Sequence, residues 1–224
     1  MTKTSHTDKA FEQDLATLRE KLLEMGAKVE KQLADSMRAL TERDSELAAA
    51  AEKADLDTNR LEVEIDDLCR RILALRQPAA SDLRFITTAL KIVTDIERCG
   101  DLAVNIAERT QELNQVPPLQ TFPDLPRLSE LAQSRLAGAL DAFVAASVEQ
   151  AEVVLKGDEL LDALYHKIFN DLLGHMMEDT RNIRRATSLM FVAKHLERVG
   201  DHATNIAEMV IYMVDSKMVR HTLA

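Results

Sequence analysis

Two acidic patterns, one in each half of the chain, have the residue types and spacing that could do chemistry. Four oxygen-bearing side chains follow one another at i, i+4, i+8 and i+11 in the first pattern: Glu97, Asp101, Asn105 and Glu108. The second pattern lies 100 residues later: Glu197, Asp201, Asn205 and Glu208. In an α-helix this spacing brings all four side chains onto one narrow face. Carboxylates one turn apart repel each other, and a bound multivalent cation would relieve that repulsion.

A second set of oxygen-bearing side chains lies upstream of each pattern, on one face of an earlier predicted helix. If the two helices of each half pack antiparallel, the faces meet, and we expect few basic partners on the same arc. Oxygen ligands without sulfur or imidazole favour magnesium, calcium, manganese or iron over structural zinc. The predicted metal-ligating residues are Asp55, Asn59, Glu62, Glu97 and Asp101 in the first half, and Asp158, Asp162, Glu197 and Asp201 in the second.

The same residues also fit an interpretation without metal. An acidic helix face is commonly just solvated, and a duplicated motif can serve helix packing instead. Gly100 and Gly200 suit the close approach of two helices, and Arg98 and Arg198 could form an interhelical ion pair. Both interpretations therefore stay open from the residues alone.

Motifs of the common enzyme classes are absent from the sequence. It contains no phosphate-cradling Walker loop, no GxGxxG, no GxSxG and no HExxH. No glutamate is followed three residues later by histidine, which argues against a ferritin-like di-iron centre. We therefore predict that the chain is not an enzyme. The two cysteines, Cys69 and Cys99, form no CxxC pair, and Cys99 falls on an apolar helix stripe, which predicts a packed, unreactive thiol.

An internal duplication places these motifs. Residues 97–108 and 197–208 are identical at nine of twelve positions, and a fainter match upstream has an offset of 103. The three-residue change of offset is predicted in the turn around Gln77-Pro78, because loops absorb insertions cheaply. Four prolines between residues 117 and 126 mark a linker. We predict a first repeat at 1–115, a Pro-rich linker at 116–126 and a second repeat at 127–224.

The composition indicates helices packed on helices. Aromatic residues make up only 4% of the chain, and it contains just 6 glycines and 5 prolines. Predicted helices span residues 8–43, 45–76, 81–114, 126–154, 158–178 and 182–217. Apolar residues recur at steps of three and four in the third and sixth helices, as in the core of a helical bundle. The predicted fold is all-α, with two tandem pseudo-symmetric three-helix bundles.

The charge balance bears on partners and location. The net charge is −10, from 38 acidic and 28 basic residues, which gives nucleic acid no basic footprint to bind. An acidic chain instead suits cations or basic protein surfaces. No apolar run approaches the roughly 18 residues of a membrane span, and the N-terminal residues lack the apolar region of a signal peptide. We therefore expect a cytoplasmic protein.

Several motifs of this sequence resemble those of the PhoU family of phosphate regulators. They are Arg76-Gln77-Pro78, Ser81-Asp82-Leu83-Arg84, the two ER-x-GD segments that end in NIAE, Met176-Met177-Glu178-Asp179 and Arg220-His221. The likeness covers nearly the whole chain. It implies an adaptor that keeps the phosphate-starvation response and high-affinity phosphate uptake off when phosphate is plentiful. The implied partners are the ATPase subunit of the phosphate transporter, through which the chain reaches the membrane, and a phosphate-sensing histidine kinase. A homodimer is also expected.

The resemblance further implies that E(D)xxxD motifs bind metal ions, in some members as iron or zinc clusters. The motif falls on Glu97 with Asp101, Glu197 with Asp201, and Asp158 with Asp162. In the first half the matching pair is Asp55 with Asn59, where an amide replaces the second acid and Glu62 could compensate. Iron, zinc, manganese, magnesium and calcium all remain candidates. The alternative function is a metal-storing or metal-sensing protein, and a redox di-iron enzyme ranks third.

Overall fold

The computed structural model describes residues 4–119 and 124–216, and within them every regular element is a helix. The first half forms three long helices, α1 (Thr4–Glu42), α2 (Ser45–Leu75) and α3 (Ala80–Asn114). The second half forms α4 (Leu125–Ala145), α5 (Val148–Lys156), α6 (Asp158–Glu178), the 3₁₀ turn η1 (Thr180–Asn182) and α7 (Ile183–Asp215). None of these helices is both long enough and apolar enough to cross a membrane.

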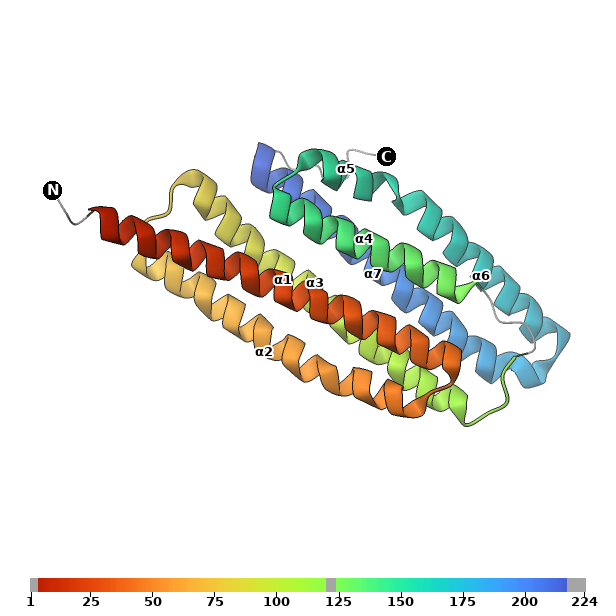
Figure 1. Cartoon of the computed structure of the whole chain (residues 1–224). Coiled ribbons are helices and arrows are strands. Elements are labelled where there is room, and N and C mark those ends of the chain that lie inside the picture. Colours follow the sequence, from red (N-terminus) through yellow and green to blue (C-terminus); the bar gives the residue numbers. More distant parts are fainter. Residues whose placement is uncertain (1–3, 120–123, 217–224) are drawn as a thin grey trace.

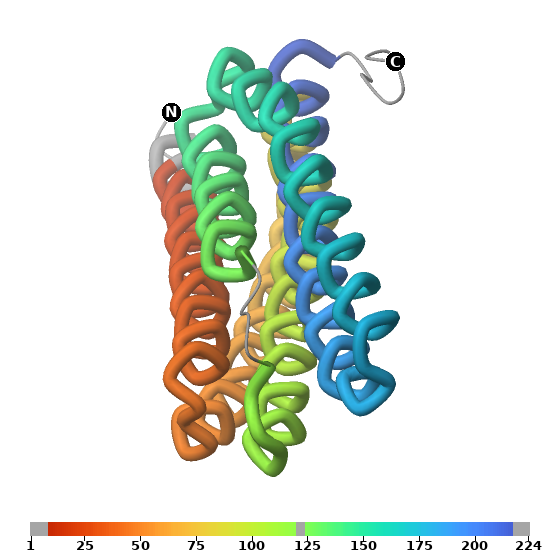
Figure 2. The backbone as a smooth tube through the Cα atoms, turned by 90° about the vertical axis from the view of Figure 1, so that its right-hand side faces the viewer, coloured from red at the N-terminus to blue at the C-terminus, as the bar shows by residue number. Residues whose placement is uncertain are grey.

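The helices form two bundles that lie side by side (Figure 1). Helices α3 and α7 pack against each other across the junction, and α1 packs against α4 beside them. Helix α2 contacts only α1 and α3, whereas α6 packs on helices of the second half alone. The two middle helices, α2 and α6, therefore lie on opposite outer sides of the molecule (Figure 2). This arrangement confirms the all-α fold with two tandem bundles.

The predicted apolar stripes form the core of both bundles. All members are buried: Ala89, Ile92, Ile96, Cys99, Ala103 and Ile106 on α3, and Leu189, Val192, Leu196, Val199, Ala203, Ile206, Val210 and Met213 on α7. They belong to one hydrophobic cluster that runs through both halves. The Cys99 side chain is fully buried, and desolvation raises the pKa of its thiol. The prediction that the thiol is packed is confirmed, and a raised pKa favours its less reactive protonated form.

The predicted helix over 126–154 is wrong. Helix α4 ends at Ala145, Ala146 takes a left-handed backbone conformation with φ 48°, and the Ser147 side chain caps α5. The same turn occurs 103 residues earlier, where Arg43 has φ 57° and Asp44 caps α2. Alanine carries no turn signal, so the apolar periodicity alone predicts an unbroken helix here. At the same offset, α5 and α6 together match α2, with an interruption at Gly157.

The turns before the third helices account for the change of offset. Four residues, 76–79, separate α2 from α3, whereas Asp179 alone separates α6 from η1. The first half is therefore three residues longer at this point. If η1 is taken as the counterpart of the first turn of α3, the difference falls in the predicted turn at Gln77-Pro78.

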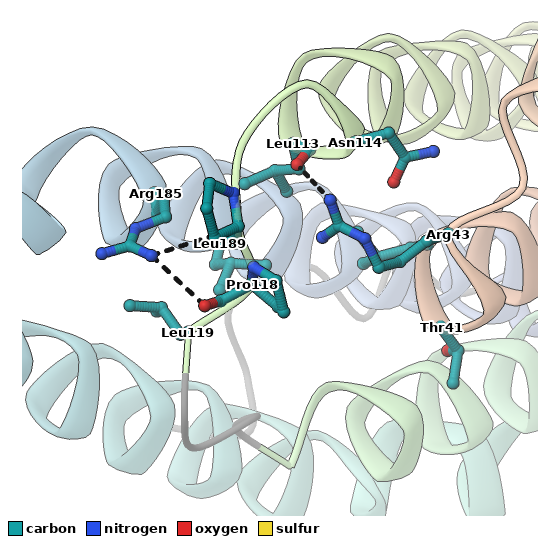
Figure 3. A pocket seen from close by; sticks show the side chains of 10 residues that line it. Thr41, Arg43, Leu113, Asn114, Pro118, Leu119, Arg185 and Leu189 are labelled. Atoms are coloured by element: carbon teal, nitrogen blue, oxygen red, sulfur yellow. Dashed lines mark hydrogen bonds between the residues drawn. The ribbon is translucent and has the colours of Figure 1, made fainter.

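Arginines from both halves hold the beginning of the segment that connects the two bundles (Figure 3). The Arg43 guanidinium donates to the carbonyl oxygens of Leu113 at 2.9 Å and Val116 at 2.7 Å. The Arg185 guanidinium donates to those of Pro117 at 3.0 Å and Pro118 at 3.2 Å. A small cavity of about 110 Å³ lies among these side chains. The beginning of the connection, as far as Pro118, therefore hydrogen-bonds with both bundles.

Replacement of Gly174 by alanine is expected to stabilise the protein by about 0.5–1 kcal/mol. Gly174 lies inside α6, and no atom outside its own helical turn would come within 4 Å of an added Cβ. Gly200→Ala is the matched control, because its Cβ would lie 3.0 Å from Leu161 Cδ1 and would force that side chain to move. Urea unfolding of both variants checks this, and a destabilised Gly174→Ala variant would contradict it.

Candidate functional site: two paired carboxylate faces

The first carboxylate face forms where α2 packs against α3. Asp55, Asn59 and Glu62 come from α2, Glu97 and Asp101 come from α3, and all five side chains are partly buried. The Asn59 amide donates to Asp55 Oδ2 at 2.8 Å. Burial raises the pKa of Glu97 above its usual range, and the negative charges of Asp101, Glu62 and Asp55 add to the rise while Arg98 opposes it. The two helix faces therefore meet as the sequence predicts.

The second face repeats this arrangement between α6 and α7. Asp158 and Asp162 come from the first half of α6, and Glu197 and Asp201 come from α7. Burial raises the pKa of Asp162, and Asp158 and Glu197 raise it further. The pKa of Asp201 is raised by burial and then by Glu197, Asp158 and Asp162, while Lys194 opposes the rise. Each face therefore gathers four mutually repelling carboxyl groups.

The expectation of few basic partners fits the first face, where Arg98 is the cation near Glu97 and Asp101, but it is wrong on the second, where Lys194 and Arg135 both pair with acids. Arg98 lies 2.9 Å from Asp101 and 3.6 Å from Glu97, all on α3, so it is engaged within its own helix. On the second face Lys194 Nζ lies 2.5 Å from Glu197 Oε2. A third cation, Arg135 from α4, lies 2.7 Å from Asp158 Oδ1.

Sequence reasoning missed Arg135 because it belongs to a helix outside the motif and shares no periodicity with the acids. At the offset of 103, Arg135 corresponds to Gln32, and Asp158 corresponds to Asp55. The repeat therefore shows that Gln32 and Arg135 occupy equivalent positions, but their contacts with Asp55 and Asp158 are seen only in the structure.

Two polar residues of the second motif serve the junction between the halves instead. The His202 ring nitrogen Nδ1 lies 2.8 Å from Asp95 Oδ1 on α3, and the Asn205 amide donates to the same oxygen at 3.3 Å. Asp95 and His202 are largely buried. Asn205 therefore points towards the first bundle rather than joining the second face as its spacing suggested. Sequence reasoning did not identify Asp95, which sits among the buried residues of α3.

The first face offers a cation more oxygen ligands than its carboxylates, because amide oxygens lie beside them. Among the described residues, no three histidine, cysteine, aspartate or glutamate side chains converge closely enough to hold a metal ion as they stand. However, Gln32 Oε1 and Asn59 Oδ1, from the two side chains that contact Asp55, are buried without a hydrogen-bond partner, and so is Glu197 Oε2 on the second face. Buried oxygens without a donor are costly, and a hard cation is one partner that would satisfy them.

Without metal, Glu97→Gln is expected to raise the melting temperature at pH 7 by about 1–3 °C. The pKa of Glu97 is raised in the folded state, so folding favours its protonated form. The contribution of Glu97 to stability is therefore fully present below the unfolded pKa of about 4.3, and it is lost as the pH rises through the folded pKa. The benefit of glutamine should therefore vanish near pH 4. Thermal melts in a chelator at both pH values check this, with the exposed Glu12→Gln as control. A lower melting temperature for Glu97→Gln at pH 7 would contradict the account.

Comparison with known proteins places this architecture, a tandem pair of helical repeats with a carboxylate face on each, in a class of accessory proteins. The PhoU domain family model matches residues 22–110 and 125–210, one match in each half. A "Phosphate-specific transport system accessory protein PhoU homolog" of Caulobacter vibrioides is 43% identical over 208 residues, which cover 92% of this chain and 90% of the relative. The chain therefore belongs to the PhoU domain family.

Solved structures agree with this assignment. The crystal structure of PhoU from Pseudomonas aeruginosa has a TM-score of 0.89 at 40% identity and covers 92% of this chain and 100% of its own. The structure of the phosphate transport system regulatory protein PhoU from Streptococcus pneumoniae has a TM-score of 0.86 at 30% identity, over 93% of this chain and 99% of its own. These names describe accessory and regulatory proteins, and the prediction that the chain is not an enzyme is confirmed.

Proposed function

We propose that this chain is an accessory regulator of phosphate transport. It restrains high-affinity phosphate uptake and the phosphate-starvation response when phosphate is plentiful. The observation that carries the proposal is the match of both repeats to one family, together with relatives at about 40% identity that are named as accessory proteins of a phosphate-specific transport system. The similarity supports the proposal for the chain as a whole, because it covers 92% of this chain and 90% of the relative.

In the finer form of the proposal, the chain is an adaptor between the transporter's ATPase subunit and a phosphate-sensing histidine kinase. Its acidic net charge of −10 would favour docking on basic partner surfaces. Such an adaptor works in the cytoplasm and reaches the membrane through its partners. Exposed apolar side chains on α2 and α6, such as Leu56, Val63 and Leu160, support further protein contacts, including the expected homodimer.

Binding of the purified chain to both purified partners tests the adaptor role. We expect it to bind the ATPase subunit and the cytoplasmic part of the kinase, with affinities that fall as salt is raised. We also expect a complex that contains all three proteins. Binding to neither partner at micromolar concentrations would contradict the adaptor role, and light scattering of the free chain would test the dimer.

We also propose that the carboxylate faces bind metal ions, with iron, zinc, manganese, magnesium and calcium as candidates. The first face would use Asp55, Asn59, Glu62, Glu97 and Asp101, and the second Asp158, Asp162, Glu197 and Asp201. Burial and, after it, repulsion between the carboxylates raise the pKa of Glu97 on the first face and of Asp162 and Asp201 on the second, and a cation there would offset both effects. The unpartnered oxygens of the first face also support a metal-storing or metal-sensing protein as the alternative function.

A further inference from the structure

The space above Gly100, in the first face, is lined by two oxygen atoms and by the Thr58 methyl carbon, which would lie 3.4 Å from an added Cβ. An added Cβ at Gly100 would lie 3.2 Å from Asp55 Oδ1 and 3.4 Å from Gln32 Oε1. Gln32 is only 2% exposed. Its amide nitrogen Nε2 donates hydrogen bonds to the Ala51 carbonyl oxygen at 3.1 Å and to Asp55 Oδ1 at 3.5 Å. Its oxygen Oε1 is buried without a donor. An unpartnered amide oxygen beside carboxylates is a ligand set that hard divalent cations prefer.

The corresponding space in the second half is filled differently. At Gly200, the counterpart of Gly100, an added Cβ would meet the apolar Leu161 side chain at 3.0 and 3.2 Å. Leu161 replaces Thr58 at the offset of 103, and Arg135 replaces Gln32. The space that two oxygens share with a methyl group in one repeat is therefore filled by a leucine side chain in the other.

Arg135 brings its own positive charge to the second face. Its side chain is 7% exposed, and its Nη2 atom lies 2.7 Å from Asp158 Oδ1 and 2.6 Å from Thr204 Oγ1. Two of the buried atoms without a hydrogen-bond partner here are the donors Nε and Nη1 of Arg135. Another is Glu197 Oε2, which lies 2.5 Å from the Lys194 ammonium, whereas in the first face the unpartnered atoms are oxygens of Gln32, Thr58 and Asn59. A guanidinium held against a carboxylate supplies the charge that a metal ion would otherwise bring, and it repels such an ion.

We propose that the two faces are not equivalent. The first half binds one divalent cation, with the Gln32 amide oxygen among its ligands next to Asp55, and the second half carries the Arg135 guanidinium in place of that cation. This inference rests on the proposed binding of metal ions at the carboxylate faces. It limits that binding to one ion per chain and adds a ligand outside the acidic motifs.

Counting Mn²⁺ ions bound to the full-length chain, by electron paramagnetic resonance of the free ion, tests the inference. We expect one ion on the wild type. Gln32→Arg, which copies the second half into the first, should lower the affinity at least tenfold. Arg135→Gln, which copies the first half into the second, should add a second bound ion. Gln13→Arg and Arg38→Gln change the same charges at exposed positions of α1 and should leave the count at one.

The possible outcomes separate this inference from the proposed function. Two equal sites on the wild type, an undiminished site in Gln32→Arg, or a single ion on Arg135→Gln that is folded by circular dichroism would each overturn the inference. The Gln32→Arg result does not depend on how well the Arg135 variant folds. No bound Mn²⁺ on the wild type would remove the proposed metal binding as well, while the regulatory role would still be decided by binding to the transporter ATPase and the kinase.

Discussion

Asp95→Ala is expected to lower the free energy of unfolding by about 2–4 kcal/mol. The Asp95 carboxylate is 12% exposed and accepts contacts from His202 at 2.8 Å and Asn205 at 3.3 Å. These contacts join α3 of the first bundle to α7 of the second. Removing the carboxylate leaves two partly buried polar side chains without this partner, and that penalty adds to the loss of the contacts themselves. Urea unfolding followed by circular dichroism measures the change.

Two further variants make the Asp95 result specific. Asp57→Ala removes a carboxylate that is 54% exposed and forms ion pairs only at 3.5 and 3.8 Å, so its cost should stay below about 0.5 kcal/mol. The Asp95→Ala/His202→Ala double variant should be less destabilised than the sum of the single variants by at least about 1 kcal/mol. Equal losses from Asp95→Ala and Asp57→Ala would show that the contact across the junction contributes little.

Ile106→Ala is expected to cost about 2–4 kcal/mol and to destabilise both bundles together. Ile106 is fully buried on α3, within the one hydrophobic cluster that continues into the second half. Because α3 packs against α7 along the junction, a cavity in the first half weakens the surface on which the second half rests. We therefore expect one cooperative transition at a lower urea concentration, not the loss of the first half alone.

The tyrosines offer a probe that separates these possibilities. Both of them, Tyr165 and Tyr212, lie in the second half, whereas circular dichroism reports on the helices of both halves. In Ile106→Ala the tyrosine fluorescence and circular dichroism transitions should shift together. A tyrosine transition that stays at the wild-type position while the circular dichroism becomes biphasic would show that the halves unfold independently. Val63→Ala, at a side chain 58% exposed on α2, is the control.

The elements of the fold that could be predicted are those marked by periodicity and by repetition. The stripe on α3 and α7 predicts a buried core because a step of three and four residues defines one helix face. The turn at Ala146-Ser147 could not be predicted in this way, since Ala146 carries no turn signal and the apolar pattern continues through it. The corresponding turn after Arg43 was expected, so a stricter use of the repeat would have corrected the second half.

The candidate site was predictable where its residues lie on the duplicated helices, and not where they come from elsewhere. Asp55 and Glu97 were found because each belongs to a spaced acidic set. Gln32 and Arg135 lie on the first helix of each repeat and reach the faces only through packing of a third helix. Asp95 was missed for a different reason. Its carboxylate is buried at the junction of the two bundles, and the spacing of residues within one helix does not predict a side-chain contact with a different helix.

The most direct test of the central claim is alkaline phosphatase activity, as a reporter of the starvation response, in phosphate-replete cells that lack this gene. The account predicts high activity in the deletion strain and its return to a low level when the wild-type chain is supplied. A second strain carries a folded variant with alanine at Glu97, Asp101, Glu197 and Asp201, expressed at the same level. If the carboxylate faces take part in signalling, alkaline phosphatase activity should stay high in this strain. Low activity in the deletion strain, in a cell with no second copy of the gene, would contradict the proposed regulatory function.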